Sequence, residues 1–572
     1  METTGASAKP RINLKARAVR LSRALSAPWP GHQRRNGSFD ERLGTSRYGD
    51  AVLGYGLLQA GVRDRNRRLV LSGLRGVNAS IHRREPGDIK DFNSWAVAAS
   101  YNLVRARLGH LPQARRSLAQ WRGWLAGRYT THLFLPYENK SLVDAIAVLE
   151  MRRTGIVSEM SSGRSVRAAK RLVNRGIPAM VSGFVLSDPA GGGSPTAYHA
   201  LSTAFYGRGV QLLGRAGSRR ARATLLQLVR TASLATAPDG DFAVWGRSMQ
   251  QKWTLTALAA GEAIAARMRG SRSSTDRHLH ALADRQLRRA AGYGVGPAGE
   301  WIVPALRQDF RVGGRGIDGY ARTTEYTGLS LVFANWAGAV LPQRRATARI
   351  PSDRNMAAQI GQWFARQASV RHGNVWFAVR EHARNNLRYD FGLQAFKRLA
   401  NGRWQDVVPL RPIGYGSAGP LLVNRGRPFS ASGQSMRVNP RTGAVDITGG
   451  FKRKRHWLRR GVRFRIAPDT CDASDIPRNA GVSVTVNARA GDRLRFSAFF
   501  RRIPEHRSTH GVWSTRAGRN PARPLNQAAV FNLPIRGVRW RRGYHSAGEA
   551  HLVRGGFSVV VRQDRDVKMT LC

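Results

Sequence analysis

Acidic residues are scarce in this sequence of 572 amino acids. It contains 35 Asp and Glu against 94 Lys and Arg, which gives a formal net charge of +59, and only ten of the basic residues are lysine. Arginine is spread over nearly every segment, whereas nucleic-acid-binding domains concentrate their charge in patches where lysine is well represented. The charge therefore fits an acidic polysaccharide as partner or a general codon bias towards arginine, and it disfavours nucleic acid.

Cysteine is nearly absent, and the export and membrane signals are weak. The two cysteines are Cys471 and Cys572. A bridge between them would close a C-terminal domain and imply an oxidising compartment, whereas two separate thiols would imply neither. The N-terminus is basic but lacks the apolar segment of a signal peptide, so an extracellular or cell-envelope location is expected without a visible export signal. The uncharged run 326–343 approaches membrane-span length, but Asn335 and a proline near its end favour a buried helix.

Several catalytic motifs are also missing. The sequence has no Walker-type glycine loop, no zincin helix, no cysteine cluster and no Gly-x-Ser-x-Gly elbow. ATP use, a structural zinc site and α/β-hydrolase chemistry are therefore disfavoured. We expect neither a metal nor a cofactor.

The apolar pattern divides the chain into three parts. Residues 1–40 are expected to be disordered or loosely attached. Residues 41–368 contain about a dozen segments with apolar residues at three- and four-residue spacing, which predicts a closed α/α toroid of helical hairpins. In residues 369–572, short segments alternate apolar and polar residues between Gly, Pro and Asn turns, which predicts an antiparallel β-sandwich.

Two stretches of the helical part suggest chemistry. TAYHALSTAFYGRGVQLLG places His199 and Tyr206 seven residues apart, on one face of a predicted helix. APDGDFAVWGRSMQQKW places Arg247 after Gly246, where its planar guanidinium is well placed to bind a carboxylate or sulfate in two contacts. Alternatively, Arg247 pairs with Asp239 or Asp241 and only staples its own loop.

The helical toroid followed by a β-domain, together with these two stretches, resembles the heparinase II/III-like and related α/α-toroid polysaccharide lyases. The His-plus-aromatic helix and the Gly-Arg-Ser helix start are similar to stretches of these enzymes. One departure is clear, because Ala197 and Tyr198 precede His199 where such lyases often have Asn-His. The resemblance implies cleavage of a uronate-containing glycan by β-elimination in the toroid, with the β-sandwich beside it.

Elimination needs a group that neutralises the uronate carboxylate, a base for the C5 proton and an acid for the leaving oxygen. We expect His199 to act as base or neutraliser, Tyr206 or Tyr326 to act as the phenolic acid or base, and Arg247 to bind the anion. The residues expected to bind substrate are Asn93, Trp95, Glu138, Asn139, Trp245, Gln250 and Tyr320. Tyr320 is also a further candidate for the phenolic acid or base. His132 lies in the predicted turn before Asn139.

Two alternative functions remain open. A glycoside hydrolase on the same toroid needs two carboxylates across a cleft, and the candidates are Asp91, Glu138, Asp239, Asp241 and Glu325. A non-catalytic protein would use its arginines and tryptophans to bind a glycan or another polyanion without chemistry. Both alternatives also have a basic cleft, so only the products of a reaction separate the three.

Overall fold

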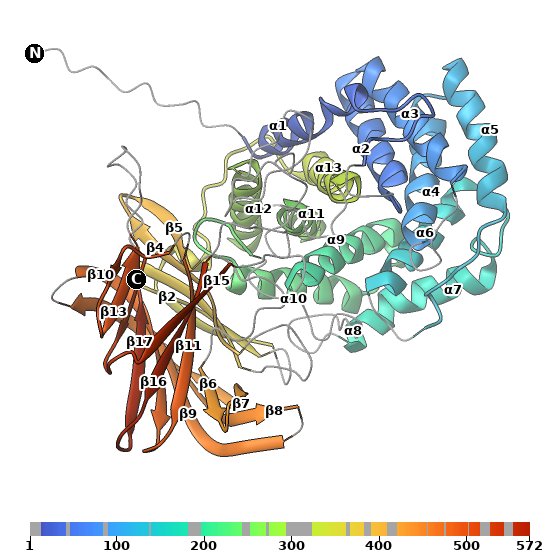
Figure 1. The fold of residues 1–572 in the computed structure, drawn as a ribbon. Coiled ribbons are helices and arrows are strands. Elements are labelled where there is room, and N and C mark those ends of the chain that lie inside the picture. The colour runs from blue at the N-terminus through green and yellow to red at the C-terminus, as the bar shows by residue number, and fades with distance from the viewer. Residues whose placement is uncertain are drawn as a thin grey trace, which may run out of the picture.

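The structure is a computed structural model of the whole chain. It describes residues 13–41, 46–83, 90–135, 139–180, 196–242, 252–269, 274–292, 323–361, 366–381, 391–408, 420–454, 456–473, 476–500, 503–514, 527–542 and 553–572. The helices gather in one body and the strands in another beside it (Figure 1). The predicted order, an α/α toroid followed by an antiparallel β-domain, is confirmed.

Six of the described helices form a closed inner ring in which each packs against the next. In ring order they are α2 (Gly49–Asp64), α4 (Lys90–Arg107), α6 (Asn139–Thr154), α9 (Thr196–Leu213), α11 (Lys252–Arg269) and α13 (Thr323–Val340), which packs on α2 again. Their side chains are buried almost all the way round, as expected for helices that are covered on every face. The run 326–343 falls largely within α13, and it is a buried helix as predicted. Across the residues that the structure describes, no helix is long and apolar enough to cross a membrane.

A second layer of amphipathic helices covers the ring. These helices are α1 (Leu14–Ser26) on α13, α3 (Arg67–Ile81) on α2, α5 (Pro112–Ala126) on α4, α7 (Gly163–Arg171) on α6, α10 (Arg219–Ala235) on α9 and α12 (Ser274–Gly292) on α11. In α3, for example, Leu69, Val70, Leu74 and Val77 face the core. Shorter turns follow α7 as η3 (Leu172–Gly176) and α8 (Ile177–Met180).

Helix α1 corrects the expectation of a loose N-terminus. Leu14, Leu21 and Leu25 are buried, and the helix packs against α13 and α12. Asn13 accepts a hydrogen bond from the backbone N–H of Ala16 at 2.7 Å, which caps the first turn. This helix is hard to recognise from the sequence because four basic residues interrupt its seven apolar ones, although the apolar residues keep helical spacing.

The strands form two antiparallel sheets that share one hydrophobic core. The smaller sheet has the order β1 (Met356–Ile360), β2 (Gln367–His372), β3 (Val375–Arg380), β4 (Gly392–Ala400) and β5 (Arg403–Val408). The larger sheet has the order β12 (His506–Arg507), β13 (Gly511–Ser514), β14 (Gln527–Phe531), β17 (Arg565–Leu571), β10 (Ile476–Ala488), β9 (His456–Ala473), β8 (Val445–Arg453), β7 (Arg427–Val438), β6 (Leu421–Asn424), β11 (Arg493–Phe500), β16 (Val553–Val560) and β15 (Gly537–Arg542).

The two sheets pack face to face as a sandwich. Phe391, from the smaller sheet's side of the core, meets Phe464 of β9 edge-on, with their ring centroids 4.7 Å apart. The first strand begins at Met356, so the sandwich includes residues that precede the boundary expected at 369.

A disulfide joins Cys471 in β9 to Cys572 at the end of the chain. Their Cα atoms lie 6.2 Å apart, within the usual range for a bridge, and both cysteines are buried. Of the two alternatives left open by the sequence, the structure therefore has the bridge and not two separate thiols. It ties the strand β17 back into the centre of the large sheet.

Replacing Cys572 by Ser is expected to lower the free energy of unfolding of the β-sandwich by roughly 4–5 kcal/mol, because the bridge closes a loop of about 100 residues in the unfolded chain. Chemical denaturation with and without a thiol reductant measures this. The reductant should destabilise the parent protein and leave Cys572→Ser unchanged. Equal stability of the parent protein in both conditions would contradict the bridge.

Candidate active site at the mouth of the helical ring

The six inner helices run in the same direction, so their N-terminal ends meet at one end of the ring, here called the mouth. At this end, Tyr48 before α2 stacks on Phe92 of α4 with ring centroids 4.5 Å apart. At the opposite end, Asn102 of α4 contacts Glu150 of α6, and Glu150 also pairs with Arg208 of α9 at 2.6 Å. The first turns of these neighbouring inner helices thus contact one another, and so do their last turns. The mouth therefore gathers the N-terminal ends of the helix dipoles, which favour anions, and at α13 the carboxylate of Glu41 already accepts the backbone N–H groups of Thr323 and Thr324.

An arginine and a glutamate join two of these helix starts. The Nη2 atom of Arg47, before α2, lies 2.8 Å from Oε2 of Glu325 in α13, and the backbone N–H of Arg47 donates to Oε1 at 2.8 Å. Glu325 is fully buried, and burial raises its pKa although Arg47 opposes the shift. Because it is bound in this way, Glu325 is not available as the acid or base of a hydrolase.

Lysine occupies the start of three inner helices. Lys90 is the first residue of α4, Lys140 the second of α6 and Lys252 the first of α11. A cation at a helix N-terminus is opposed by the helix dipole, so these positions are locally unfavourable. Burial lowers the pKa of Lys252 to about 7. Three of only ten lysines thus lie at the mouth of the ring, in a protein whose other cations are mostly arginine.

Aromatic side chains connect three neighbouring helix starts. Trp253 of α11 meets Tyr326 of α13 edge-on at 5.7 Å and Tyr198 of α9 at 6.4 Å between ring centroids. Arg47 interacts electrostatically with Tyr326. Tyr326, an expected phenolic residue, therefore lies at the mouth beside both the aromatic row and a cation.

His199 also lies at the mouth, in the first turn of α9. Its Nε2 atom lies 3.1 Å from the carbonyl oxygen of Leu228 in α10, and its ring lies 6.0 Å from that of Phe242. A contact with a carbonyl requires the proton on Nε2, which leaves the lone pair of the neutral ring on Nδ1. In this assignment Nδ1 is the basic nitrogen.

Tyr206 lies two turns further along the same helix, away from the mouth, and like His199 it is fully buried. Its hydroxyl donates to the carbonyl oxygens of Val173 at 3.0 Å and Ala221 at 3.2 Å, and the side chain is fully buried. Burial raises its pKa. We therefore assign Tyr206 to the core between α9, η3 and α10, in place of the acid or base expected from the sequence.

Trp95 is likewise a core residue rather than the expected surface for stacking on sugar. It is fully buried, and its ring meets Tyr55, Phe205 and Trp336 edge-on. Its position in α4 faces the centre of the ring, where apolar packing outweighs the polarity of the indole N–H.

Asn93 and Asn139 do lie at the mouth. Asn93 is in the first turn of α4, and its Nδ2 atom lies 3.4 Å from the carbonyl oxygen of Arg47. Asn139 is the first residue of α6 and is half-buried. Both amides therefore lie at helix starts of the mouth, and their role in substrate binding stays a prediction. The other expected site residues lie outside the described residues; they are Glu138, Trp245, Arg247, Gln250 and Tyr320.

The two aspartates of the Pro-Asp-Gly-Asp turn bind the β-sandwich. The Nζ atom of Lys397 in β4 lies 2.9 Å from Asp239 and 3.2 Å from Asp241, and Arg289 of α12 lies 3.2 Å and 3.1 Å from the same two carboxylates. Lys397 is fully buried. Asp239 and Asp241 therefore belong to an interdomain ion cluster and are not free to serve a hydrolase.

The turn itself has a backbone that requires glycine. Gly240 has φ = 93°, and a Cβ atom at this position would lie 2.5 Å from the carbonyl oxygen of Arg285. Ala237 packs in the same place against Trp376 and Ala378 of β3. This turn leads from α10 towards the start of α11, so the sandwich holds one of the segments that enter the mouth.

Asp91 and Asp144 are the remaining acidic candidates at the mouth. Burial and the nearby carboxylate of Asp144 raise the pKa of Asp91 well above its usual range. Asp144 accepts the backbone N–H groups of residues 131–133 at 2.9–3.0 Å through one oxygen. His132 Nδ1 lies 3.9 Å from Asp91. Asp91 and His132 can be named as candidates from the sequence, whereas Asp144 cannot, because it occupies an ordinary polar position within its helix.

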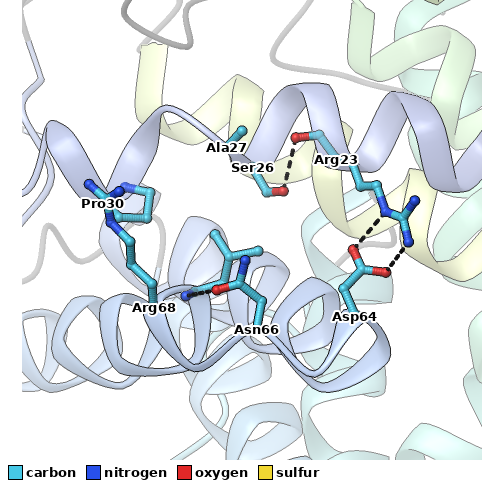
Figure 2. Close-up of a pocket in the computed structure, with 8 residues that line it drawn as sticks. Arg23, Ser26, Ala27, Pro30, Asp64, Asn66 and Arg68 are labelled. Carbon is cyan, nitrogen blue, oxygen red and sulfur yellow. Dashed lines mark hydrogen bonds and ion pairs between the residues drawn. The ribbon is translucent and has the colours of Figure 1, made fainter.

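A pocket of about 400 Å³ lies at the other end of the ring, between α1 and the turn from α2 to α3 (Figure 2). Its charged groups bind one another, since Arg23 donates to both oxygens of Asp64 at 3.1 and 3.0 Å. Its position at the C-terminal end of α2 separates it from the mouth. It does not belong to the candidate site.

No protein-family model and no curated protein sequence matches this chain. Solved structures do. Heparinase III superposes with a TM-score of 0.52 over 100% of this chain and 86% of that chain, at 9% sequence identity. The fold is that of heparinase III. The expected resemblance to the α/α-toroid polysaccharide lyases is therefore confirmed at the level of the fold.

Two further structures are similar at lower TM-scores. The chondroitin AC lyase of Streptomyces coelicolor A3, solved with chondroitin sulphate, is 11% identical, with a TM-score of 0.46 over 100% of this chain and 80% of that chain. The unsaturated glucuronyl hydrolase of Bacillus sp. GL1 is 14% identical, with a TM-score of 0.37 over 59% of this chain and 100% of that chain. Such distant similarity carries no argument about function.

Replacing Lys397 by Met is expected to cost about 3–5 kcal/mol of stability, because two buried carboxylates lose one of their cations. Lys568→Met is the matched control, since Lys568 pairs with Asp469 at 3.3 Å while 44% of its side chain is exposed, and it should cost less than about 1 kcal/mol. Thermal and chemical unfolding measure both. Similar losses for the two variants would contradict the buried cluster.

Proposed function

We propose that the protein is a polysaccharide lyase that cleaves a uronate-containing glycan by β-elimination at the mouth of the helical ring. The observation that supports this most is the placement of Lys90, Lys140 and Lys252 at three converging helix starts. The helix dipole opposes a cation at each of these positions, and a bound anion offsets that opposition. The heparinase III fold supports the same reaction class.

In this proposal the substrate carboxylate is bound by the cations of the mouth and by the first-turn N–H groups. Lys252 and Arg247 neutralise it, and the amides of Asn93 and Asn139 donate hydrogen bonds. Neutralisation of the carboxylate lowers the cost of negative charge at C5. Glu138, Trp245, Gln250 and Tyr320, in the segments that lead into the inner helices, complete the proposed contacts with the sugar.

The proton transfers are assigned to His199 and Tyr326. One takes the C5 proton, the electrons of that C–H bond form the C4–C5 double bond, and the C4–O bond breaks. The other gives a proton to the departing oxygen. Arg47 is a cation that interacts electrostatically with Tyr326 at the mouth. No water is consumed, so the new end of the chain is unsaturated.

A glycoside hydrolase is the second candidate, and one observation favours it. Asp91 and Asp144 form a pair of buried carboxyl groups at the mouth, and the raised pKa of Asp91 suits a general acid. In this case Asp144 would be the second carboxylate, and the products would contain the elements of water.

The products distinguish the two reactions. A lyase acting on chondroitin sulfate, heparin or another uronate polymer gives a product that absorbs in the ultraviolet and lacks the added mass of water. Tyr326→Phe should slow its formation by a factor on the order of 10²–10⁴. Tyr206→Phe, the matched removal of a buried hydroxyl, should keep turnover and lose about 1 kcal/mol of stability. Products with added water, or full activity of Tyr326→Phe, would contradict the proposed mechanism.

The role of Lys252 gives the reaction a pH dependence. Because burial lowers its pKa to about 7, the ammonium is present below that pH and lost above it, so the affinity for the anionic substrate should fall as the pH rises through 7. Lys252→Arg should abolish this dependence because its charge persists. Lys252→Met should lower kcat/KM at least about 30-fold at pH 6. The same pH profile in the parent protein and Lys252→Arg would exclude this role.

A further inference from the structure

A basic hairpin lies at one end of the large sheet, and neither the fold nor the proposed chemistry explains it. At the turn between β8 and β9, β9 extends beyond β10, whose pairing with β9 ends at Phe464, while β7 stays paired with β8 as far as Lys452. From Phe451 to Arg465, eight of the fifteen residues are Lys or Arg and none is acidic. The exposed hairpin thus concentrates charge that elsewhere in the chain is dispersed.

The cations of the hairpin tip are presented outwards. Arg453, Lys454, Arg460 and Arg463 are exposed, and within the described part of the chain no carboxylate forms a salt bridge with any of them. Their neighbours are different, since Arg459 pairs with Asp492 and Arg465 with Asp446. Arg459 and Arg465 therefore fasten the hairpin to neighbouring segments, whereas Arg453, Lys454, Arg460 and Arg463 keep their charge for a partner.

One aromatic ring organises the tip. Trp457 lies between Lys452 and Arg460, with the cations 5.5 and 5.6 Å from its ring centroid. It pairs across the hairpin with Lys452, and the ring covers Gly450, where a Cβ atom would come within 3.0 Å of the indole. Cation–π contacts of this kind hold two long side chains in place, which reduces the entropy lost when they bind an anion.

The charged tip continues into a groove on the same sheet. The groove has a volume of about 400 Å³ and is lined by Thr448, Arg463, Thr485 and Asn487, with the carboxylates of Asp446 and Asp566 at its sides. Hydroxyl, amide and carboxylate groups bind sugar hydroxyls, and arginine binds carboxylate or sulfate in a planar pair of hydrogen bonds. These carboxylates oppose the charge of any polyanion, but they accept hydrogen bonds from sugar hydroxyls, which a DNA backbone lacks.

We propose that the β8–β9 hairpin and its groove form a second binding surface for an acidic polysaccharide, separate from the mouth of the ring. The proposal rests on the proposed function for the identity of the polymer. A long chain is held at this surface while another part of it occupies the mouth, so the surface raises the local concentration of polymer without taking part in the chemistry.

The test compares two variants of equal charge. The hairpin variant combines Arg453→Ser, Lys454→Ser and Arg460→Ser. The control combines Arg115→Ser, Arg116→Ser and Arg122→Ser in the outer helix α5, where all three arginines are exposed. Equilibrium titration with long heparin and chondroitin sulfate chains, at several salt concentrations, measures the affinity. The hairpin variant should bind at least about tenfold more weakly with a shallower salt dependence, and the control should change less than about twofold.

Activity on short oligosaccharides separates this proposal from the lyase assignment. The hairpin variant should keep the parent turnover on a tetrasaccharide and lose efficiency only on long chains. Equal losses of affinity in the two variants would overturn the proposal, because the charge would then act as a diffuse background. Tighter binding of a short duplex DNA than of either glycan, lost only in the hairpin variant, would overturn it in favour of nucleic acid. Hairpin-dependent glycan binding without any unsaturated product would overturn the lyase assignment alone.

Discussion

The common direction of the six inner helices is the constraint on which the rest of the structure depends. Each inner helix is covered on all sides, so only its ends can offer polar groups to a ligand. Because the helices are parallel, their free N–H groups and first-turn side chains converge at one end. The placement of Lys252, Tyr326 and His199 follows from this geometry, although they are far apart in the sequence.

The β-sandwich contributes to that end through the buried cluster of Lys397 with Asp239 and Asp241. Such a cluster is costly to desolvate, and it is satisfied only when both bodies are docked, so it specifies their relative orientation as well as holding them together. The smaller sheet thereby carries the interface, and the larger sheet is left with an open face. That division of tasks leaves the β8–β9 hairpin outside the interface.

Much of the fold is predictable from the sequence, because periodic apolar residues report burial directly. The inner helices and the strands after Val370 follow in this way, and α1 was missed because basic residues obscure its apolar stripe. The site is less predictable. Tyr206 and His199 share a helix and a spacing, yet the hydroxyl of Tyr206 is bound by two carbonyl groups of η3 and α10, which no local pattern reports. Lys252 lies five residues after Arg247 in the sequence, and no local pattern reports that its helix start converges with those of Lys90 and Lys140.

The pairing of α1 with α13 has a consequence for synthesis. The first helix of the toroid completes the layer around the last one, so the ring remains an open arc until the ribosome has passed residue 340. During that time the apolar sides of α2 and α11 that later meet α13 lack their partner. Helix α1 cannot pack until α13 has been synthesised, so the toroid completes its folding late. Until then the exposed apolar surface of the partly formed ring must be protected from aggregation.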